Sequence, residues 1–503
     1  MFCVLCGSFP LIGGISLGYA TPLQPARPRR YVHAVTTKAT SVDSTSGRWI
    51  LAASILGSGA VFLEGSVVSV AIPSIGRDLG LGIAGLQWVM NGYLLTLSAL
   101  ILFGGALGDR GSRAHVFAFG LVGFAVSSVG CALAPNIALL VVSRVIQGVS
   151  GALVVPNSLA ILETTFHGEA RGVAIGRWAA WSAVSTAGGP LVGGWVVDVG
   201  TWRWVFLSIV PFALAAAWIA FRHAGTVEKS RQRKSSSIDY AGAALTTLAL
   251  GAIVSALIAG PDMGFTSLPI LGGLVGGAIL LIAFFAVEER AENPLLPLDV
   301  FRSREFVGAN LNTLLVYAAL NGLFFLLMLE LQNGLGYSAL IAGSSLLPVN
   351  LLLLVLSPWS GKLAEKIGAR WPMTIGSVVA GVGMLLFGRV KPGSSYFGTI
   401  LPALLVFGTG LGLLVAPLTA AALRALGEKR AGVASGANNA IARLAGLLAT
   451  AIIPVAAGLG GAQQLKGAVL SAAFTRATVI CAALCGAGAL VAAATIGRSP
   501  PRA

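Results

Sequence analysis

Long apolar runs separated by short polar segments fill the chain from about residue 49 to residue 495. Each run has about twenty residues or slightly more, which is the length that an α-helix needs to cross the hydrocarbon core of a bilayer. The pattern therefore predicts an all-helical protein with fourteen membrane-spanning helices. They begin near Ile50, Leu86, Ala114, Ile137, Val173, Trp204, Tyr240, Pro269, Phe306, Gly343, Pro372, Tyr396, Gly432 and Ala473.

The composition supports this membrane assignment. Of the 503 residues, 56% are hydrophobic and 10% are charged, and the mean hydropathy is +0.87, whereas a soluble domain is about 25% charged. The 66 glycines fit the close helix packing found in lipid. The net charge of +15 is scattered through short loops rather than gathered in a basic groove. We therefore expect the lipid bilayer, and not nucleic acid, as a partner.

The distribution of Lys and Arg predicts the orientation. With both termini in the cytoplasm, the six inner loops hold seventeen of these residues and the outer loops hold six. An excess of positive charge marks the cytoplasmic side of a membrane protein. The sequence therefore predicts a multi-pass protein of the cell (inner) membrane with both termini cytoplasmic, and we expect it to function as a monomer.

Residues 1–48 differ from the rest of the chain. Residues 21–48 are rich in Arg, Ser and Thr and hold one acidic residue. This composition resembles an organellar transit peptide, which would direct the protein to an organellar membrane. A start codon placed too early on a bacterial gene explains it equally well, and the residues do not decide between the two.

Polar segments divide the apolar part into a 6 + 2 + 6 plan. We predict a six-helix half over 49–221, a linker over 222–239, two additional helices and a loop over 240–305, a second six-helix half over 306–495 and a tail over 496–503. The two halves share weak repeats, because "GALGDR" at 105–110 recurs as "GKLAEK" at 361–366. Paired halves of this kind are typical of transporters, whose substrates bind between the repeats at the midplane.

Two ionisable side chains lie inside predicted spans at matched depth. Glu64 precedes Pro73, at the outer end of the first span, by about nine residues, and Arg144 lies about seven residues from the outer end of the fourth. At 1.5 Å per residue, both lie about 10 to 14 Å below the outer edge. A charge inside a membrane needs a partner or a function. We expect an ion pair that takes part in transport, with a static pair that fixes helix packing as the alternative.

Two motifs indicate contacts that form and break as helices move. "GALGDRGSR" at 105–113 places mixed charges in a short cytoplasmic loop, and we expect a charge latch rather than a loop that only sets topology. "TAGGPLVGGWVVD" at 186–198 gives the fifth span a nearly bare, kinked surface, because Pro removes a backbone hydrogen bond and Gly lets another helix approach. The residues concerned are Gly105, Asp109, Arg110 and Arg113 in the latch, and Gly188, Gly189, Pro190, Gly193 and Gly194 in the fifth span.

These stretches resemble the signature motifs of the major facilitator superfamily, in its fourteen-helix drug–proton antiporter branch. "GALGDRGSR" resembles the family's loop after the second helix, with Ser112 where Gly is usual. "RVIQG" at 144–148 resembles the motif of the fourth helix, and "GGPLVGG" at 188–194 resembles the antiporter motif of the fifth. "LEGSVVSVAIPSIGRDLG" resembles the motif of the first helix, with Glu64 where Asp is commoner. The resemblance covers about residues 49–495.

The resemblance implies export of amphipathic drugs or metabolites in exchange for protons, with the proton gradient in place of a cofactor. In this interpretation Glu64 carries the proton, Arg144 tunes it, and a cationic substrate competes for Glu64. Three alternatives stay open. They are an exporter dedicated to one endogenous product (an antibiotic, a lipid or a siderophore), an uptake symporter, which "GGPLVGG" disfavours, and a membrane sensor or scaffold that does not transport.

The substrate pocket is marked less clearly. On the ninth span, Asn310, Tyr317 and Asn321 lie at positions i, i+7 and i+11 and so share one face of the helix. We expect this face to line a cavity. No Ser-His-Asp arrangement, metal cluster or phosphate loop appears, so an enzyme or a metal site is not expected. The substrate-binding candidates are Gln87, Asn91, Gln147, Trp181, Asn310, Tyr317, Asn321, Asn439 and Arg443.

Overall fold

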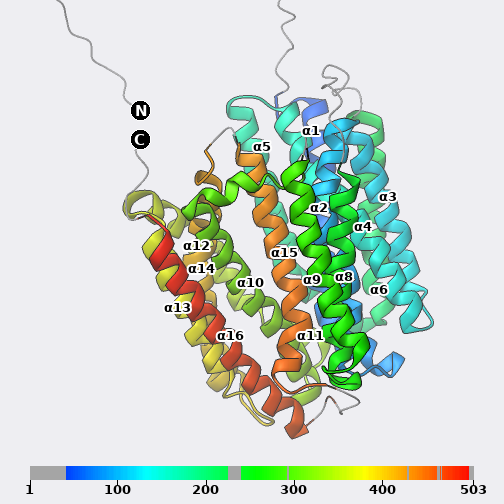
Figure 1. Ribbon diagram of the computed structural model, residues 1–503, viewed down its shortest axis with the longest axis vertical. Helices are drawn as coiled ribbons and strands as arrows, with labels where there is room; N and C mark the ends of the chain where they lie inside the picture. Colours follow the sequence, from blue (N-terminus) through cyan, green and yellow to red (C-terminus); the bar gives the residue numbers. More distant parts are fainter. Residues whose placement is uncertain are drawn as a thin grey trace, which may run out of the picture. The chain divides into compact units, whose positions relative to one another are not determined.

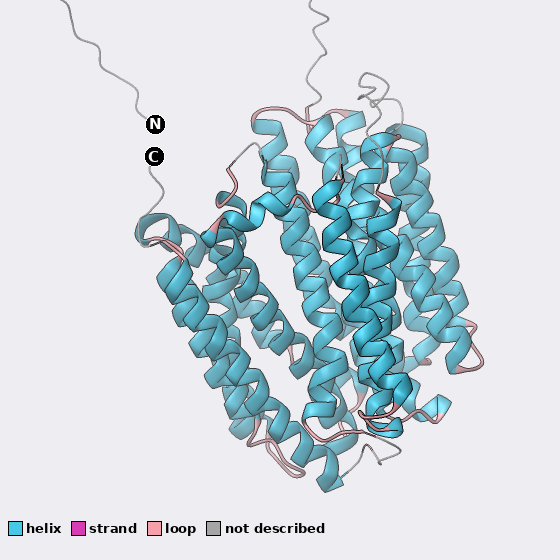
Figure 2. Cartoon of the chain, viewed as in Figure 1, coloured by secondary structure: helices cyan, strands magenta, loops and turns pink. Residues whose placement is uncertain are grey.

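The computed structural model describes residues 41–224, 239–291, 294–427, 430–460, 465 and 467–497. Most of the predicted N-terminal extension, the 222–239 linker and the 496–503 tail lies outside these residues. Within them the chain folds into helices joined by turns and short loops, without strands (Figure 2). Thirteen of the described helical segments are long and apolar enough to cross a membrane, and α5, which is 31 residues long, falls outside that criterion. Together they account for the fourteen predicted spans and confirm the fold class.

The two halves and the inserted pair follow one another along the chain (Figure 1). The first half comprises α1 (Thr45–Leu79), α2 (Ile83–Arg110), α3 (Arg113–Ala132), α4 (Ile137–Thr165), α5 (Glu169–Val199), α6 (Trp202–Ile219) and the π-helical turn η1 (Ala220–Ala224). The inserted pair is α8 (Tyr240–Met263) and α9 (Leu268–Arg290), followed by the short helix η3 (Leu298–Arg302). The second half comprises α10 (Arg304–Leu329), η4 (Glu330–Gly334), α11 (Ala339–Ser344), α12 (Leu347–Ile367), α13 (Arg370–Phe387), η5 (Tyr396–Ile400), α14 (Leu401–Arg424), α15 (Ala431–Ala456) and α16 (Gly467–Thr495).

Polar caps explain where several helices begin. The side chain of Ser44 accepts the N–H of Gly47 at 3.1 Å, so α1 begins at Thr45, inside the segment predicted to be an extension. Asn136 caps α4 in the same way through the N–H of Leu139, at 3.0 Å. A side-chain oxygen at the N-cap satisfies a backbone donor that the helix itself leaves free, which stabilises the start of the helix.

The two halves repeat one packing scheme. In the first half, α1 packs against α5 and α6, α3 packs against α4 and α6, and α2 packs against α4. In the second half, α10 packs against α15 and α16, α13 packs against α14 and α16, and α12 packs against α14. Each helix of one half therefore has a counterpart in the other, as the sequence repeats at the ends of α2 and α12 predict.

The inserted helices lie against the junction between the halves. α8 packs against α9, against α2 of the first half and against α15 of the second half. Figure 1 shows α8 beside α2 in front of the bundle. The most apolar stretch of α9 is only 17% buried within the protein, which leaves most of it to face lipid. The pair therefore flanks the contact between α2 and α15.

Hydrogen bonds between the halves gather at the end of the bundle predicted to be extracellular. The carboxylate of Asp198 on α5 accepts the N–H groups of Ala339 and Leu340 at 3.0 and 2.8 Å and so caps α11 of the other half. Two further bonds of this kind join Arg77 to Asn333, at 3.0 Å, and Gln332 to the carbonyl of Val70, at 2.8 Å. We call these contacts the outer seam; they comprise Val70, Arg77, Asp198, Gln332, Asn333, Ala339 and Leu340.

Glycines bring α5 against helices of both halves at the outer seam. A Cβ on Gly193 would come within 2.8 Å of Val67 on α1, and one on Gly194 would overlap the backbone of Ala339 on α11. Toward the inner end, the exposed positions of α5 dominate, and the space around Gly172 and Gly176 is open. The structure is therefore a conformation closed at its outer end.

Glycine also sets the spacing of α2 and α4. A Cβ on Gly148 of α4 would overlap Thr96 and the carbonyl of Tyr93 on α2, and would lie 3.1 Å from the nitrogen of Leu97. Thr96 uses the same close approach to donate a hydrogen bond to the carbonyl of Val145 at 2.8 Å. The two helices can thus touch through backbone atoms, as small residues allow in membrane proteins.

Replacing Gly148 with Ala should destabilise the protein, because the added methyl forces α2 and α4 apart. Overpacking of this kind costs about 1 to 3 kcal/mol. Thermal unfolding of the purified protein in detergent measures the loss. Gly176→Ala is the matched control, since nothing lies within 4 Å of its Cβ position. Equal melting temperatures for the two variants would contradict this account of the helix contact.

Asp198→Ala should open the outer seam, because α11 loses both hydrogen bonds from the other half. Loss of about 1.4 kcal/mol shifts the equilibrium between closed and open forms tenfold. Spin labels at Leu133 and Phe397, which are 71% and 78% exposed, report the distance between the two halves at this end. We expect a longer distance to become populated.

Asp78→Ala is the control for this measurement. Asp78 also lies at the outer end, but it pairs with Arg203 and accepts the indole N–H of Trp202 within one half. A shift of the same size in both variants would show that general loosening, and not the seam, is responsible.

Candidate functional site: a buried ion pair and a free arginine

An ion pair between α1 and α4 lies in the interior of the first half. Arg144 donates from Nη1 to Oε1 of Glu64, and both side chains are 0% exposed. The structure thus brings together the two charges whose matched depths predicted a partnership. Without water to solvate them, both side chains depend on each other and on nearby polar groups.

Two further helices, α2 and α3, hold Arg144 in place. Its Nε donates to the carbonyl of Val89 on α2 at 2.9 Å, and its Nη1 donates to Oε1 of Gln147 at 2.7 Å. Gln147 in turn donates to the hydroxyl of Ser128 on α3 at 2.8 Å. The guanidinium carbon also lies 4.5 Å from the centre of the Tyr93 ring. Gln147, a predicted substrate-binding candidate, is therefore a fully buried member of this network in this conformation.

Each side chain of the ion pair has one further polar atom at its end. Within the described residues, Oε2 of Glu64 and Nη2 of Arg144 are buried without a hydrogen-bond partner. One carboxylate oxygen is therefore bound to the arginine, while the other forms no hydrogen bond with the described residues. Direct competition of a substrate for Glu64 is not available in this conformation, because the side chain is completely covered.

A second cation lies where the halves face each other. The guanidinium carbon of Arg443 on α15 is 5.4 Å from the centre of the Phe62 ring on α1. Phe62 also contacts Trp178 of α5 edge-on, with 6.4 Å between ring centres. The sequence pointed to Arg443, but it did not single out Phe62 or Trp178, because one aromatic residue in an apolar span carries no signal by itself.

Two of the predicted pocket residues connect helices. Gln87 is 1% exposed and donates to the carbonyls of Thr450 and Ala451 on α15, at 2.8 and 3.1 Å, so it joins the halves. Asn310 is buried and accepts a hydrogen bond at 3.1 Å from Asn438, the neighbour of the predicted Asn439. In this conformation both side chains are buried in contacts between helices, and their part in substrate binding stays a prediction.

The face of α10 that was predicted to line a cavity mostly contacts another helix. Asn321 donates to the carbonyl of Tyr317 on its own helix at 2.8 Å and lies against Gly446 of α15. Tyr317 stays partly exposed between these contacts, as Asn439 does on α15. The reason is that the shared face of α10 points at α15, which helical spacing along one chain segment cannot show.

The last two candidates differ in exposure. Asn91 is 0% exposed, and neither its Oδ1 nor its Nδ2 has a hydrogen-bond partner within the described residues. Trp181 is 55% exposed on α5. Asn91 is thus an enclosed polar group, whereas the exposure of Trp181 fits either lipid or an open cavity.

The loop after α2 holds an internal ion pair. Arg113 pairs with Asp109 and donates to the carbonyl of Ala160 at the end of α4, at 3.1 Å. Arg110 is exposed. A Cβ on Gly105 would make only ordinary contact with Pro156, at 3.5 Å.

Two other glycines near the end of α2 make the close approach to α4. A Cβ on Gly104 would overlap the carbonyl of Ala152, and one on Gly108 would overlap the side chain of Asn157. The close approach to α4 is therefore made by Gly104 and Gly108, one residue before and three residues after the predicted Gly105.

The five residues of the glycine-rich motif of α5 differ in what lies around them. Gly189 lies against Ser66 of α1, and the carbonyl of Pro190 lies against Gly343 of α11. Gly188 has open space around it. Of the five predicted residues, four therefore lie in close helix contacts and Gly188 does not.

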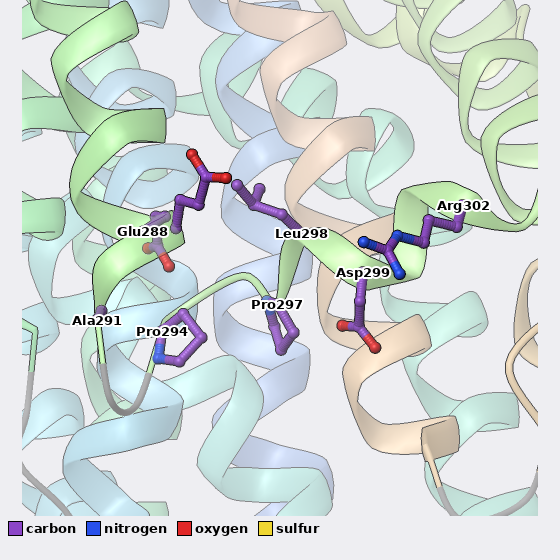
Figure 3. Close-up of a pocket in the computed structure, with 8 residues that line it drawn as sticks. Glu288, Ala291, Pro294, Pro297, Leu298, Asp299 and Arg302 are labelled. Carbon is purple, nitrogen blue, oxygen red and sulfur yellow. The ribbon is translucent and has the colours of Figure 1, made fainter.

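A pocket lies at the inner end of the bundle, where α9 leads into η3 (Figure 3). Asp299 in this pocket pairs with Arg430, just before α15, and this bond holds the pKa of the Asp299 carboxyl below its ordinary range. The pocket is lined by Glu288, Glu289, Ala291, Pro294, Pro297, Leu298, Asp299 and Arg302. No group of three or more His, Cys, Asp or Glu side chains in the described part of the chain is placed to hold a metal ion.

The helical scheme, the paired halves and the buried ion pair within the first of them are the features of a membrane transporter fold. A family model of the Major Facilitator Superfamily matches residues 54–450, and the chain belongs to this family. The crystal structure of a D-xylose-proton symporter has the same fold, with a TM-score of 0.61, 15% sequence identity and coverage of 90% of this chain and 98% of that one. A peptide transporter solved in complex with sulfate gives a TM-score of 0.63 at 15% identity, covering 90% and 95%.

Relatives with higher identity carry names of resistance and export proteins. The multidrug resistance protein Stp of Mycobacterium tuberculosis (strain ATCC 25618 / H37Rv) is 33% identical over 387 residues, which is 77% of this chain and 71% of that protein. The tetracenomycin C resistance and export protein of Streptomyces glaucescens is 34% identical over 78% of this chain and 73% of its own. The methylenomycin A resistance protein of Bacillus subtilis (strain 168) is 32% identical over 86% and 93%.

Arg144→Gln should destabilise the protein by about 3 to 5 kcal/mol, because it leaves the Glu64 carboxylate buried without its partner. Glu64→Gln combined with Arg144→Gln should be less destabilising than the sum of the two single changes. A double-mutant cycle measured by thermal unfolding in detergent tests this. The exposed pair of Glu163 and Arg171 is the control, for which we expect at most about 1 kcal/mol. Additive effects at Glu64 and Arg144 would contradict the coupling.

Proposed function

We propose that this protein exports small amphipathic compounds across the cell membrane in exchange for protons, with Glu64 as the proton-carrying group. The observation that carries the proposal is the completely buried ion pair, in which Oε2 of Glu64 has no hydrogen-bond partner in the described part of the chain. Carboxyl groups inside a membrane bundle mark proton relays more often than structural contacts. No metal or other cofactor is needed, because the proton gradient supplies the energy.

Protonation of Glu64 would remove the negative charge that Arg144 faces. The arginine would keep its hydrogen bonds to Val89 and Gln147 but lose its counter-charge. A buried cation without a partner is unfavourable, so the protonated form favours a rearrangement of α1 relative to α4. Proton binding at one side chain would thus act on the packing of two helices.

α1 connects the ion pair to the outer seam. Glu64 and Val70 lie on the same helix, and the carbonyl of Val70 accepts the side-chain N–H of Gln332 from the other half. A shift of α1 therefore acts on both contacts together. In the proposed orientation, with both termini in the cytoplasm, loading of Glu64 with a proton would be linked to opening or closing of the external side.

The energy available is sufficient for export. A potential of about 150 mV supplies about 3.5 kcal/mol per proton. Since each 1.4 kcal/mol corresponds to a factor of ten, one proton supports a concentration gradient of a few hundred fold.

The names of the relatives support export and agree with two kinds of exporter. One relative is named as a multidrug resistance protein, and another as a resistance and export protein for tetracenomycin C. The second candidate function is therefore export of one endogenous product. The two differ in how many unrelated compounds the protein accepts, and not in the proton step.

Glu64→Gln should abolish proton efflux from acid-loaded everted vesicles when a panel of amphipathic compounds of either charge is added. The variant keeps the size of the side chain but cannot exchange a proton, so at least a tenfold loss of compound-dependent efflux is expected. Glu163→Gln, at a partly exposed carboxylate, is the control and should behave as wild type.

Other outcomes separate the candidates. Efflux that persists in Glu64→Gln would show that this carboxyl is structural. A response to one compound of the panel would favour the dedicated exporter, and a response to many would favour multidrug export. A folded wild type that responds to none would contradict the proposal.

A further inference from the structure

Arg443 is a membrane-embedded cation to which the described residues supply no counter-charge. It lies within α15, about a dozen residues from the start of a predicted span. Within the described residues it forms no ion pair, unlike Arg144, whose partner is Glu64. A charged side chain inside a membrane is costly unless it faces a partner or a cavity. The free guanidinium therefore indicates that a partner comes from outside the chain.

The surroundings of Arg443 are aromatic and come from both halves. Its guanidinium lies over the ring of Phe62, and Phe62 contacts Trp178 edge-on. Tyr317 lies one turn before Asn321, which contacts Gly446 on the same helix as Arg443. A guanidinium over an aromatic face is stabilised without using its N–H groups, which leaves those donors free to bind an anion.

The neighbouring side chains leave this position open. Arg443, Phe62, Trp178 and Tyr317 are all partly exposed, in contrast to the covered ion pair of Glu64 and Arg144. Asn439 lies one turn earlier on the same face of α15 and is also partly exposed. The position thus combines a cation, an amide and aromatic rings between the two halves.

Resting on the proposed export function, we propose that Arg443 binds the anionic group of the transported compound, while Phe62, Trp178 and Tyr317 contact its apolar or aromatic body. The ligand class is an amphipathic acid: a carboxylate, sulfonate or phosphate attached to a ring system or an alkyl chain. A planar guanidinium suits such groups because it donates two parallel hydrogen bonds. A lipophilic cation would instead meet an uncompensated positive charge at the same place.

The buried carboxyl groups of the two halves, Glu64 and Glu330, do not offset this preference. Glu64 is covered and engaged by Arg144, so a cationic ligand between the halves has no accessible carboxylate there. Glu330, the buried carboxyl of the second half, accepts the hydroxyl of Ser471 at 2.6 Å at the end of α10. The site thus keeps a net positive charge.

Binding of two dyes that share a xanthene ring system tests the charge preference directly. Fluorescein is anionic and rhodamine 6G is cationic, and fluorescence anisotropy measures their binding to the full-length protein in nanodiscs of zwitterionic lipid. We expect wild type to bind fluorescein at least tenfold more tightly than rhodamine 6G. Arg443→Gln should lose at least tenfold in fluorescein affinity, Arg443→Lys should retain most of it, and Arg443→Glu should reverse the order.

The controls separate this inference from a folding defect and from failure of the proposed function. Arg177→Gln removes an arginine that is 52% exposed and should leave both affinities unchanged. Glu64→Gln should lose proton exchange, whereas the fluorescein binding of this variant should still depend on Arg443. If fluorescein binding depends on Arg443 but no proton flux follows, the antiport proposal fails and the anion site stands.

Two results would overturn the inference. One is tighter binding of rhodamine 6G by wild type, and the other is fluorescein affinity within twofold of wild type in a folded Arg443→Gln. Adding phosphatidylglycerol to the nanodiscs tells two sources of the anionic group apart. Displacement of fluorescein by this lipid assigns the anion site to a lipid headgroup, and unchanged binding assigns it to a soluble acid.

Discussion

The ion pair of Glu64 and Arg144 is the constraint on which the arrangement of the first half depends. Two charges removed from water need each other and as many hydrogen bonds as geometry allows. α2 contributes the carbonyl of Val89, and α3 reaches the pair through Ser128 and Gln147. Such contacts require helices to pack closely, which glycines such as Gly148 make possible. The small residues of this half therefore allow the close helix packing that its buried charges require.

α1 connects the ion pair to the second half of the molecule. It presents Phe62 to Arg443 of the second half, Glu64 to Arg144, and Val70 to Gln332 at the outer seam. Because a packed helix moves largely as a rigid element, these three contacts cannot change independently. A change of charge at Glu64 thus alters the seam and the Arg443 region together, without any direct contact between the ligands.

The sequence predicts the features that depend on depth and length, and misses those that depend on rotation about helix axes. The spans follow from bilayer thickness, and the partnership of Glu64 with Arg144 follows from their matched distance to the membrane edge. The seam contact of Asp198 with α11 could not be foreseen, because it joins segments far apart in the chain. Asn438 was missed beside Asn439 because a step of one residue turns a side chain by about 100°.

The charges near the midplane bear on how exchange is achieved. Glu64 and Arg144 cancel, so Arg443 leaves one uncompensated positive charge between the halves. A proton on Glu64 adds positive charge, whereas an anion on Arg443 removes it, so these ligands do not repel each other and do not compete for one group. Exclusion of one by the other must then come from the helices, which expose the two sites at different stages of the cycle. The covered state of Glu64 in the same conformation that leaves Arg443 partly exposed is consistent with this division.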